Sequence, residues 1–271
     1  MPQIPLEDNF TDVIGKAMRG LNLADSVVAE RAHLDVKMVQ SVRSGEVDEV
    51  ALQAIAPVLG LHGGALAAMA RMDWTPGIVQ VDGLAQFNTV FEDMTVNAYL
   101  VWDPATRDAA LFDTGSDASD ALQFAEDNGL RIGSILLTHT HGDHIFDLDR
   151  VREKTRAAAF VGDREPLKGA ESFEPGRTFQ IGSLRVETRL TWGHSKGGIT
   201  YVVTGLARPV EVVCDAVFAS SMGGGGISYA DALRTNRAEI LTLSDETVLC
   251  PGHGPMTTVG EEKAHNPFFA R

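Results

Sequence analysis

The chain has 271 residues, of which 44% are hydrophobic and 22% are charged, as in an ordinary globular protein. Its net charge of −14 argues against a general nucleic-acid-binding protein, because neutralising phosphates needs a basic face. No apolar run is long enough to span a bilayer, and the acidic start MPQIPLEDNF does not resemble a signal peptide. With only Cys214 and Cys250, we expect a cytoplasmic protein without a disulfide framework or a membrane partner.

The first part of the chain predicts helices. Apolar residues recur at helical spacing from Phe10 to Met18, and residues 23–61 predict several short helices interrupted near Leu34 and at Gly45. The breakers at 76–77 then end the helical pattern. We therefore expect a small all-α domain over residues 1–75 and a second domain over residues 76–271.

The second part predicts strands that alternate with helices, which indicates an α+β class. Helices are expected over 119–128 and 229–241. Short apolar runs bounded by turn residues predict strands. These runs are NAYLVWD, AALFDTG, IGSILLTH, AAAFVGD, LRVETRL, GITYVVT, VEVVCDAVF and TVLCPGH.

One predicted strand ends in a dense group of polar residues, LLTHTHGDHIFDL. It contains His139, His141, Asp143 and His144, with Gly142 relieving the turn. Neutral imidazole and carboxylate are the usual ligands of zinc and neighbouring metals. A polar turn with surface histidines is the alternative, and the metal site is the favoured interpretation.

Further candidate ligands follow other predicted strands. His194 and His253 lie in the glycine-rich turns TWGHSKGG and CPGHGP, and Asp215 ends the run VEVVCD. Loops at strand ends converge at one edge of a sheet, so we expect these residues to meet the histidine-rich loop. Three other histidines lack this context and are expected to be surface or packing residues. They are His33, His62 and His265.

The order H-x-H-x-D-H, a glycine-flanked His, an Asp after a strand and a final G-H-G resembles the metallo-β-lactamase fold superfamily. The ending VLCPGHGPMTTVGEEKAHNPFF resembles its glyoxalase II-like branch, that is, hydrolases resembling hydroxyacylglutathione hydrolase. The resemblance covers about residues 77–271. It implies a four-layer αββα sandwich, here preceded by the small helical domain.

The resemblance also implies two divalent metal ions and their ligands. The first ion would be held by His139, His141 and His194. The second would be held by Asp143, His144 and His253, with Asp215 bridging both. Asp113, in LFDTG, would orient one of the ligands. Zinc is expected first, with iron or manganese as alternatives.

One position departs from the family pattern. Cys214 stands directly before Asp215, where the family usually has glycine. A small buried thiol is the favoured interpretation, and a redox or metal-perturbing role is the alternative.

The resemblance implies hydrolysis of an acyl thioester by a metal-bound hydroxide, with Asp143 orienting the hydroxide or taking its proton. Lys196 is expected either to pair with a substrate carboxylate or to be a solvated loop lysine. Lactone or ester hydrolysis would use the same nucleophile. A mononuclear-iron persulfide dioxygenase is another alternative, and it would need only His139, His194 and Asp215.

Residues 23–61 resemble a Cro-repressor-type helix-turn-helix domain, with a recognition helix at about Asp35–Ser44. This opens a non-enzymatic alternative, a DNA-binding regulator with a metallohydrolase-like sensor domain. However, residues 1–75 carry ten acidic and six basic side chains, a net charge of −4, which opposes groove binding. We therefore favour a repurposed helical module that mediates homodimer contacts or covers the mouth of the active site.

Overall fold

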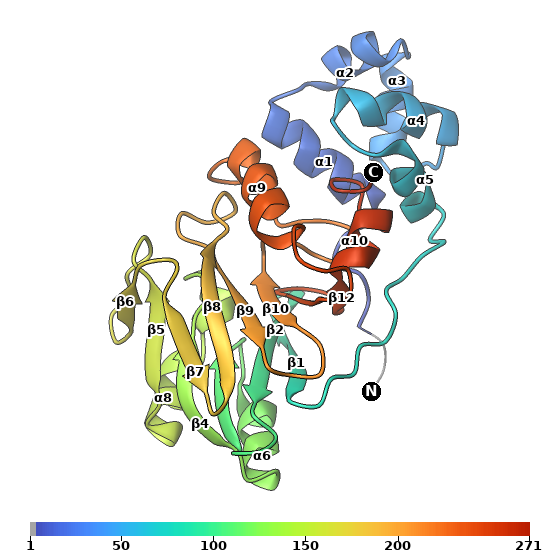
Figure 1. Ribbon diagram of the computed structural model, residues 1–271. Helices are drawn as coiled ribbons and strands as arrows, with labels where there is room; N and C mark the ends of the chain where they lie inside the picture. Colours follow the sequence, from blue (N-terminus) through green and yellow to red (C-terminus); the bar gives the residue numbers. More distant parts are fainter. Residues whose placement is uncertain (1–3) are drawn as a thin grey trace.

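The computed structural model describes residues 4–271. Two six-stranded sheets pack face to face, and helices cover the outer side of each sheet (Figure 1). This arrangement confirms the expected α+β class and the four-layer sandwich. Among the described residues, no helix combines the length and apolar character that crossing a membrane requires.

Five short helices form the N-terminal region at the upper right of Figure 1. Asn9 begins the first helix with a capping box completed by Asp12, and Asp35 and Asp48 cap the third and fourth. The helix expected over about 35–44 is present as α3 (Val36–Arg43), and its role in DNA recognition stays a prediction. The five helices are α1 (Phe10–Leu21), α2 (Asp25–Ala32), α3 (Val36–Arg43), α4 (Glu49–Val58) and α5 (Gly63–Ala70).

The first sheet has the strand order β1-β2-β3-β4-β5-β6. Its first three strands pair antiparallel, and β3 to β6 pair parallel. The strands are β1 (Leu84–Phe91), β2 (Met94–Trp102), β3 (Asp108–Phe112), β4 (Arg131–Leu136), β5 (Ala158–Gly162) and β6 (Glu171–Phe173). Helices α6 (Ser119–Asp127) and α8 (Leu148–Thr155) contribute to the apolar cluster on its outer face.

The second sheet has the strand order β12-β11-β10-β9-β8-β7. Its strands are β7 (Thr178–Ile181), β8 (Leu184–Leu190), β9 (Ile199–Thr204), β10 (Val210–Cys214), β11 (Val248–Pro251) and β12 (Thr257–Thr258). The covering helices are α9 (Tyr229–Thr235), the π-helix η1 (Asn236–Ile240) and α10 (Val259–His265). Strands β1, β6, β7 and β12 were not in the sequence prediction, because they are short or only partly buried.

The N-terminal helices share one hydrophobic core with the sandwich. Phe10 and Ile14 of α1 belong to the same buried cluster as Val213 of β10, Tyr229 of α9 and Phe268 near the C-terminus. Figure 1 shows α1 beside α9 and α5 beside α10. The helices are therefore packed onto the sandwich rather than tethered to it. The division at residue 75 into two domains stays a prediction.

Candidate metal centre

The expected ligands lie at the C-terminal ends of strands from both sheets. The histidine-rich loop follows β4, and its short helix α7 (Gly142–Ile145) begins at the glycine. His194 follows β8, Asp215 follows β10, and His253 follows β11. Strands β10 and β11 are parallel neighbours, and β9 separates β10 from β8 in the same sheet. The fold thus delivers these loops to one edge of the sandwich.

Three histidines and one aspartate form the first group of ligand atoms. His139 Nε2 lies 2.9 Å from His141 Nδ1, and that atom lies 3.1 Å from His194 Nε2. The Oδ2 atom of Asp215 lies 3.2 Å from His194 Nε2 and 3.9 Å from His139 Nε2. Four ligand atoms therefore surround one point, as a single metal ion requires.

The second group adjoins the first. The Oδ2 atom of Asp143 lies 3.3 Å from His144 Nε2 and 3.5 Å from His253 Nε2. Asp215 reaches this group as well, because its Oδ1 lies 3.4 Å from His144 Nε2 and its Oδ2 lies 3.5 Å from His253 Nε2. One carboxylate thus faces both groups, and the arrangement is that of a two-metal site.

The chemistry of these atoms fits metal ions. Imidazole nitrogens of His139, His141 and His194 face each other at hydrogen-bond distance, although a neutral imidazole has only one N–H to donate. In addition, His144 Nε2 is buried and has no hydrogen-bond partner among residues 4–271. Buried polar atoms are rarely left unsatisfied, and a cation would satisfy all of these lone pairs together.

The outer ring nitrogens are held by oxygen atoms. The Nδ1 atom of His253 lies 2.6 Å from the carbonyl oxygen of Thr95, and that of His194 lies 3.0 Å from the carbonyl oxygen of Gly224. A carbonyl oxygen can only accept, so Nδ1 donates and Nε2 keeps its lone pair for the site. Gly224 belongs to the GGGG loop, which thereby gains a structural role.

Asp113 holds two of the histidines. Its Oδ2 lies 3.1 Å from His144 Nδ1, and it accepts a hydrogen bond of 2.7 Å from the hydroxyl of Thr138. Because that hydroxyl donates to Asp113, it can accept from His139 Nδ1 at 3.1 Å. The amide of Thr138 also donates to Asp113 Oδ1 at 2.8 Å. The geometry supports the orienting role expected of Asp113.

Burial and neighbouring charges shift the pKa values of Asp215 and His253 in opposite directions. Burial alone would raise the pKa of Asp215, yet His144, His253 and His194 hold the pKa of that carboxyl well below its usual range. Burial lowers the pKa of His139 far below its ordinary value. Burial also disfavours charge on His253, but Asp215 outweighs it and raises the pKa to about 9. A bound cation would take the place of the proton on His253, and its attraction to Asp215 would replace that of the protonated imidazole.

Cys214 is buried directly beneath the ligands. Its Sγ lies 3.3 Å from Asp113 Oδ2 and 3.4 Å from His144 Nδ1. Burial raises the pKa of the thiol well above its ordinary value, which supports the interpretation as a small buried thiol. Its φ of +46° lies in the left-handed region, which explains why glycine suits this position.

Sequence reasoning missed Glu165, which connects two ligand loops. Its Oε2 accepts the amide of Thr140 at 3.1 Å, and its Oε1 accepts the amides of Lys196 at 2.8 Å and Gly197 at 3.2 Å. One carboxylate therefore fixes the loop of His139 and His141 relative to the loop of His194. No motif surrounds Glu165, and only the folded chain reveals this contact.

The remaining candidates lie outside the ligand groups. The side chain of Lys196 is exposed, and its pairing with a substrate carboxylate stays a prediction. His33 is exposed at the end of α2, His62 caps α5 by accepting the amide of Ala65 at 3.0 Å, and His265 stacks on Trp74. These three histidines have the surface and packing roles expected for them.

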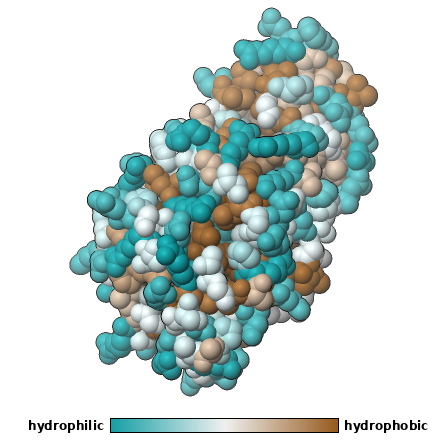
Figure 2. Space-filling model, viewed as in Figure 1, coloured by the Kyte–Doolittle hydropathy of each residue, from teal (hydrophilic) through white to brown (hydrophobic). Residues whose placement is uncertain are grey.

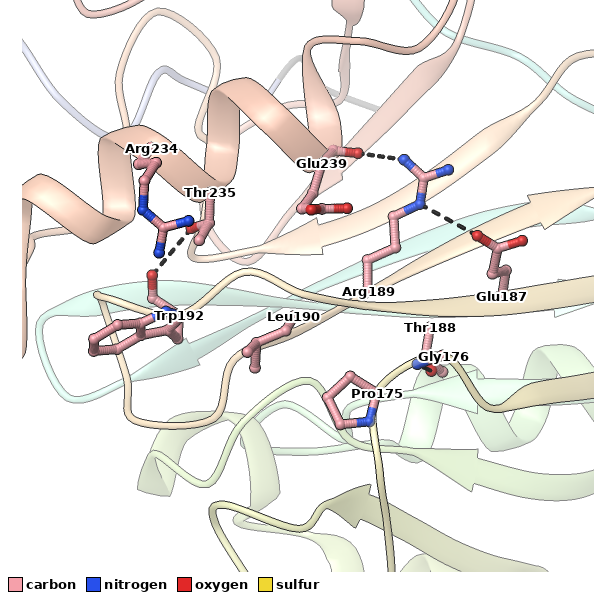
Figure 3. A pocket seen from close by; sticks show the side chains of 10 residues that line it. All are labelled: Pro175, Gly176, Glu187, Thr188, Arg189, Leu190, Trp192, Arg234, Thr235 and Glu239. Carbon is pink, nitrogen blue, oxygen red and sulfur yellow. Dashed lines mark hydrogen bonds and ion pairs between the residues drawn. The ribbon is translucent and has the colours of Figure 1, made fainter.

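A separate hollow of about 550 Å³ lies on the outer side of β8, below α9 and η1 (Figure 3). Two arginines line it, and both are paired. Arg189 donates to the carbonyl oxygen of Glu239 at 2.6 Å and lies 3.5 Å from Glu187, while Arg234 lies 2.7 Å from Asp231. None of the metal-centre residues lines this hollow, and its cations are already satisfied.

Known proteins of the metallo-hydrolase kind are similar to this chain. The Bacillus subtilis protein named Probable metallo-hydrolase YqgX is 31% identical over 190 residues, covering 59% of this chain and 86% of that protein. Hydroxyacylglutathione hydrolase GloC of Haemophilus influenzae is 26% identical, covering 64% of this chain and 92% of that protein. The crystal structure of ETHE1 from Myxococcus xanthus is 27% identical with a TM-score of 0.60, covering 69% and 84% of the two chains.

The model of the metallo-beta-lactamase superfamily matches residues 92–253, which is more than half of the chain. This range contains Asp113 and runs to His253, so it includes every residue of the two ligand groups. The match begins after the five N-terminal helices. The chain therefore belongs to the metallo-beta-lactamase superfamily and has the site of a metallo-hydrolase.

Proposed function

We propose that the protein is a dinuclear metal-dependent hydrolase that acts on an acyl thioester. The observation that carries the proposal is the pair of ligand groups joined by Asp215, whose two oxygens face both groups. The similarity to a protein named hydroxyacylglutathione hydrolase supports a thioester as the substrate class. The proposed ligands are His139, His141 and His194 on one side, Asp143, His144 and His253 on the other, and Asp215 between them.

Two divalent ions held at this site would lower the pKa of a shared water toward neutrality and polarise an acyl carbonyl. Asp143 can orient that water or take its proton. Burial raises the pKa of Asp143, but neighbouring His144 outweighs burial, so the net shift is downward and favours the carboxylate. A thiolate leaves readily without an acid partner, so a thioester makes small demands on the rest of the site.

Apolar side chains near the ligands support an acyl substrate. Phe146, at 69% exposure, follows the short helix of His144, and its ring lies 5.7 Å from the ring of Phe91. Met94, at 40% exposure, precedes Thr95, whose carbonyl oxygen holds His253. Exposed aromatic and thioether side chains beside a polar centre are suited to an apolar acyl group.

The proposal is tested by elemental analysis of protein purified without added metal, together with assays on an acyl thioester, a lactone and a persulfide. We expect two divalent ions per chain and thioester turnover that chelators abolish. A His265→Ala variant, which removes a ring that stacks on Trp74 and belongs to neither ligand group, serves as the control and should behave as the wild type. One iron per chain with oxygen consumption on the persulfide would overturn the proposal, as would turnover of the lactone alone.

A further inference from the structure

The loop between β10 and α9 begins at the shared ligand Asp215 and contacts another ligand through Phe218. Phe218 is buried, and its ring packs edge-on against the ring of His253, with the ring centres 5.5 Å apart. The Nδ1 atom of His253 is held by the carbonyl oxygen of Thr95 at 2.6 Å. A single hydrogen bond leaves an imidazole free to tilt about that contact, whereas a packed ring restricts the tilt. Phe218 therefore helps to direct His253 Nε2 toward the second ligand group.

The loop of Phe218 is held from both ends of the chain. Within the loop, the backbones of Phe218 and Ser221 exchange hydrogen bonds of 3.1 and 3.0 Å. From α10, the carboxylate of Glu262 accepts the amide of Ser220 at 2.9 Å. From the segment that precedes α1, buried Asp8 accepts the hydroxyl of Ser221 at 2.6 Å. The position of the Phe218 ring thus depends on the N-terminal part of the chain as well as on the sandwich.

Lys16 of α1 brings a largely buried cation to this loop. Its side chain is 13% exposed, and it forms an ion pair with Asp8, whose side chain is 8% exposed. The ammonium also donates to the carbonyl oxygen of Met222 at 2.8 Å and lies 4.9 Å from the ring centre of Phe218. The attraction between a cation and an aromatic ring is stronger when the cation is desolvated. One ammonium therefore contacts the N-terminal segment, the loop backbone and the ring that packs on His253.

The segment that precedes α1 also lies against the backbone next to His253. Gly254 has a φ of +74°, and a Cβ atom there would lie 3.1 Å from the backbone nitrogen of Glu7 and 3.5 Å from the carbonyl oxygen of Pro5. Glycine suits both the left-handed conformation and this close approach. The N-terminal part of the chain therefore reaches His253 by two routes, through the backbone at Gly254 and through the ring of Phe218.

We propose that Lys16 is a positioning residue for the ligand His253, which it reaches through the ring of Phe218, and that α1 thereby sets the affinity for the second metal ion. The inference rests on the two-metal centre of the proposed function and does not depend on the choice of substrate. Lys16 lies before the range 92–253 that the superfamily model matches. His253 belongs to the second ligand group, with Asp143 and His144, so loss of the anchor should weaken the second ion more than the first.

Zinc affinity provides the first test. Competition with a chromophoric chelator gives a Kd for each Zn²⁺ ion, and the step that His253→Ala weakens identifies the second ion. Asp8→Asn combined with Lys16→Met removes both charges, so that no unpaired charge is left buried. We expect this double variant and Phe218→Leu each to weaken the second ion about tenfold and the first ion less. Equal weakening of both ions, or no weakening, would overturn the inference.

Combining the substitutions tests the route through the ring. In Phe218→Leu, adding Asp8→Asn and Lys16→Met should weaken the second ion no further, because Lys16 acts through that ring. Losses that add would overturn the inference. Val28→Ala is the matched control for a merely structural role, because Val28 is buried in α2 within the same apolar cluster. It should lower the Tm and leave both zinc affinities unchanged, and a tenfold loss at the second ion in this variant would also overturn the inference.

These results separate the inference from the proposed function. If two Zn²⁺ ions bind and thioesters are turned over, but the second affinity does not depend on Lys16 or Phe218, only the inference fails. If no thioester is turned over but the coupled loss of affinity is observed, the proposed function fails and the positioning role of Lys16 stands. Metal binding that does not depend on His253 would overturn both.

Discussion

The histidine cluster and the hollow on β8 differ in how their polar atoms are satisfied. In the cluster, nitrogen and oxygen atoms from distant strand ends lie close together with too few N–H groups to hydrogen-bond to one another, and His144 Nε2 has no hydrogen-bond partner in the described chain. In the hollow of about 550 Å³, Arg189 and Arg234 are already paired with neighbouring oxygens (Figure 3). In this protein, converging ligand atoms without hydrogen-bond partners therefore identify the candidate functional site better than the volume of a cavity does.

The difference between the cluster and the hollow predicts that removing the carboxylate of Asp215 has the largest effect on activity. Asp215→Ala deletes the carboxylate that faces both sets of ligands, so we expect kcat/KM to fall by a factor on the order of 10³ or more. His139→Ala should behave similarly, with a far-UV circular dichroism spectrum like that of the wild type. Asp149→Ala, at a 97% exposed side chain, is the control. Wild-type turnover in Asp215→Ala would refute the metal centre.

Weakening the hydrogen bonds that orient the ligand histidines should have the next largest effect, which we expect on metal affinity. Asp113→Asn keeps the shape of the side chain but removes the charge that holds His144 and, through Thr138, His139. We expect metal affinity to fall about 10- to 100-fold, measured by competition with a chromophoric chelator. Affinity equal to that of the wild type would show that packing alone orients these rings.

Breaking the hydrogen bonds between the loop of His139 and His141 and the loop of His194 should have a smaller effect on metal affinity. Glu165→Gln replaces an acceptor of three amide hydrogens by a side chain whose NH₂ group cannot accept. We expect metal affinity to fall by up to about tenfold, which corresponds to one charged hydrogen bond of about 1.5 kcal/mol. Glu171→Gln, an exposed residue paired with Arg177, is the matched control. Equal affinities in both variants would contradict the role given to Glu165.

A buried acid in β10 predicts a pH-dependent stability. Glu211 is fully buried, both its oxygens lack partners in the described chain, and burial raises its pKa well above the ordinary value. The native state therefore keeps a proton that the unfolded chain releases above pH 4.5, so the wild type loses stability as pH rises. Relative to the wild type, the free energy of unfolding of Glu211→Met should increase by up to about 1.4 kcal/mol for each pH unit above 4.5. Urea unfolding at pH 5.5 and 8.5 measures this, and a pH-independent difference would contradict it.

Disturbing the hollow itself should have the smallest effect. Arg234→Ala removes an exposed cation that pairs with Asp231, so we expect stability to change by less than about 1 kcal/mol. Its kcat/KM on a thioester should stay within about twofold of the wild type, because the hollow has no residue in common with the ligand groups. A tenfold loss of kcat/KM would show that the hollow takes part in catalysis and would contradict the distinction between the hollow and the ligand cluster.

The N-terminal helices show where sequence reasoning reached its limit. Their helical character, their order and the position of α3 were predicted, because apolar periodicity and caps are local signals. Their attachment to α9 and to β10 in one core was not, because it depends on contacts between residues about 200 positions apart. Figure 2 shows apolar patches over the α2 to α4 region, and Val36 and Met38 of α3 are partly exposed. The homodimer through these helices and the cytoplasmic location stay predictions.

The sequence by itself determined the candidate ligands, because each lies in a short motif directly after a recognisable strand. His139, His194 and Asp215 could be named as candidate ligands without coordinates, because each follows a predicted strand and fits the motif order of the family, although the structure places their strands in two different sheets. Only the tertiary structure decided which other residues belong to the site. Glu165 has no motif, and its contacts with two ligand loops arise only when segments far apart in the chain pack together. A side chain whose role depends on contacts between distant segments has no local periodicity or motif spacing, so its role cannot be predicted from the sequence.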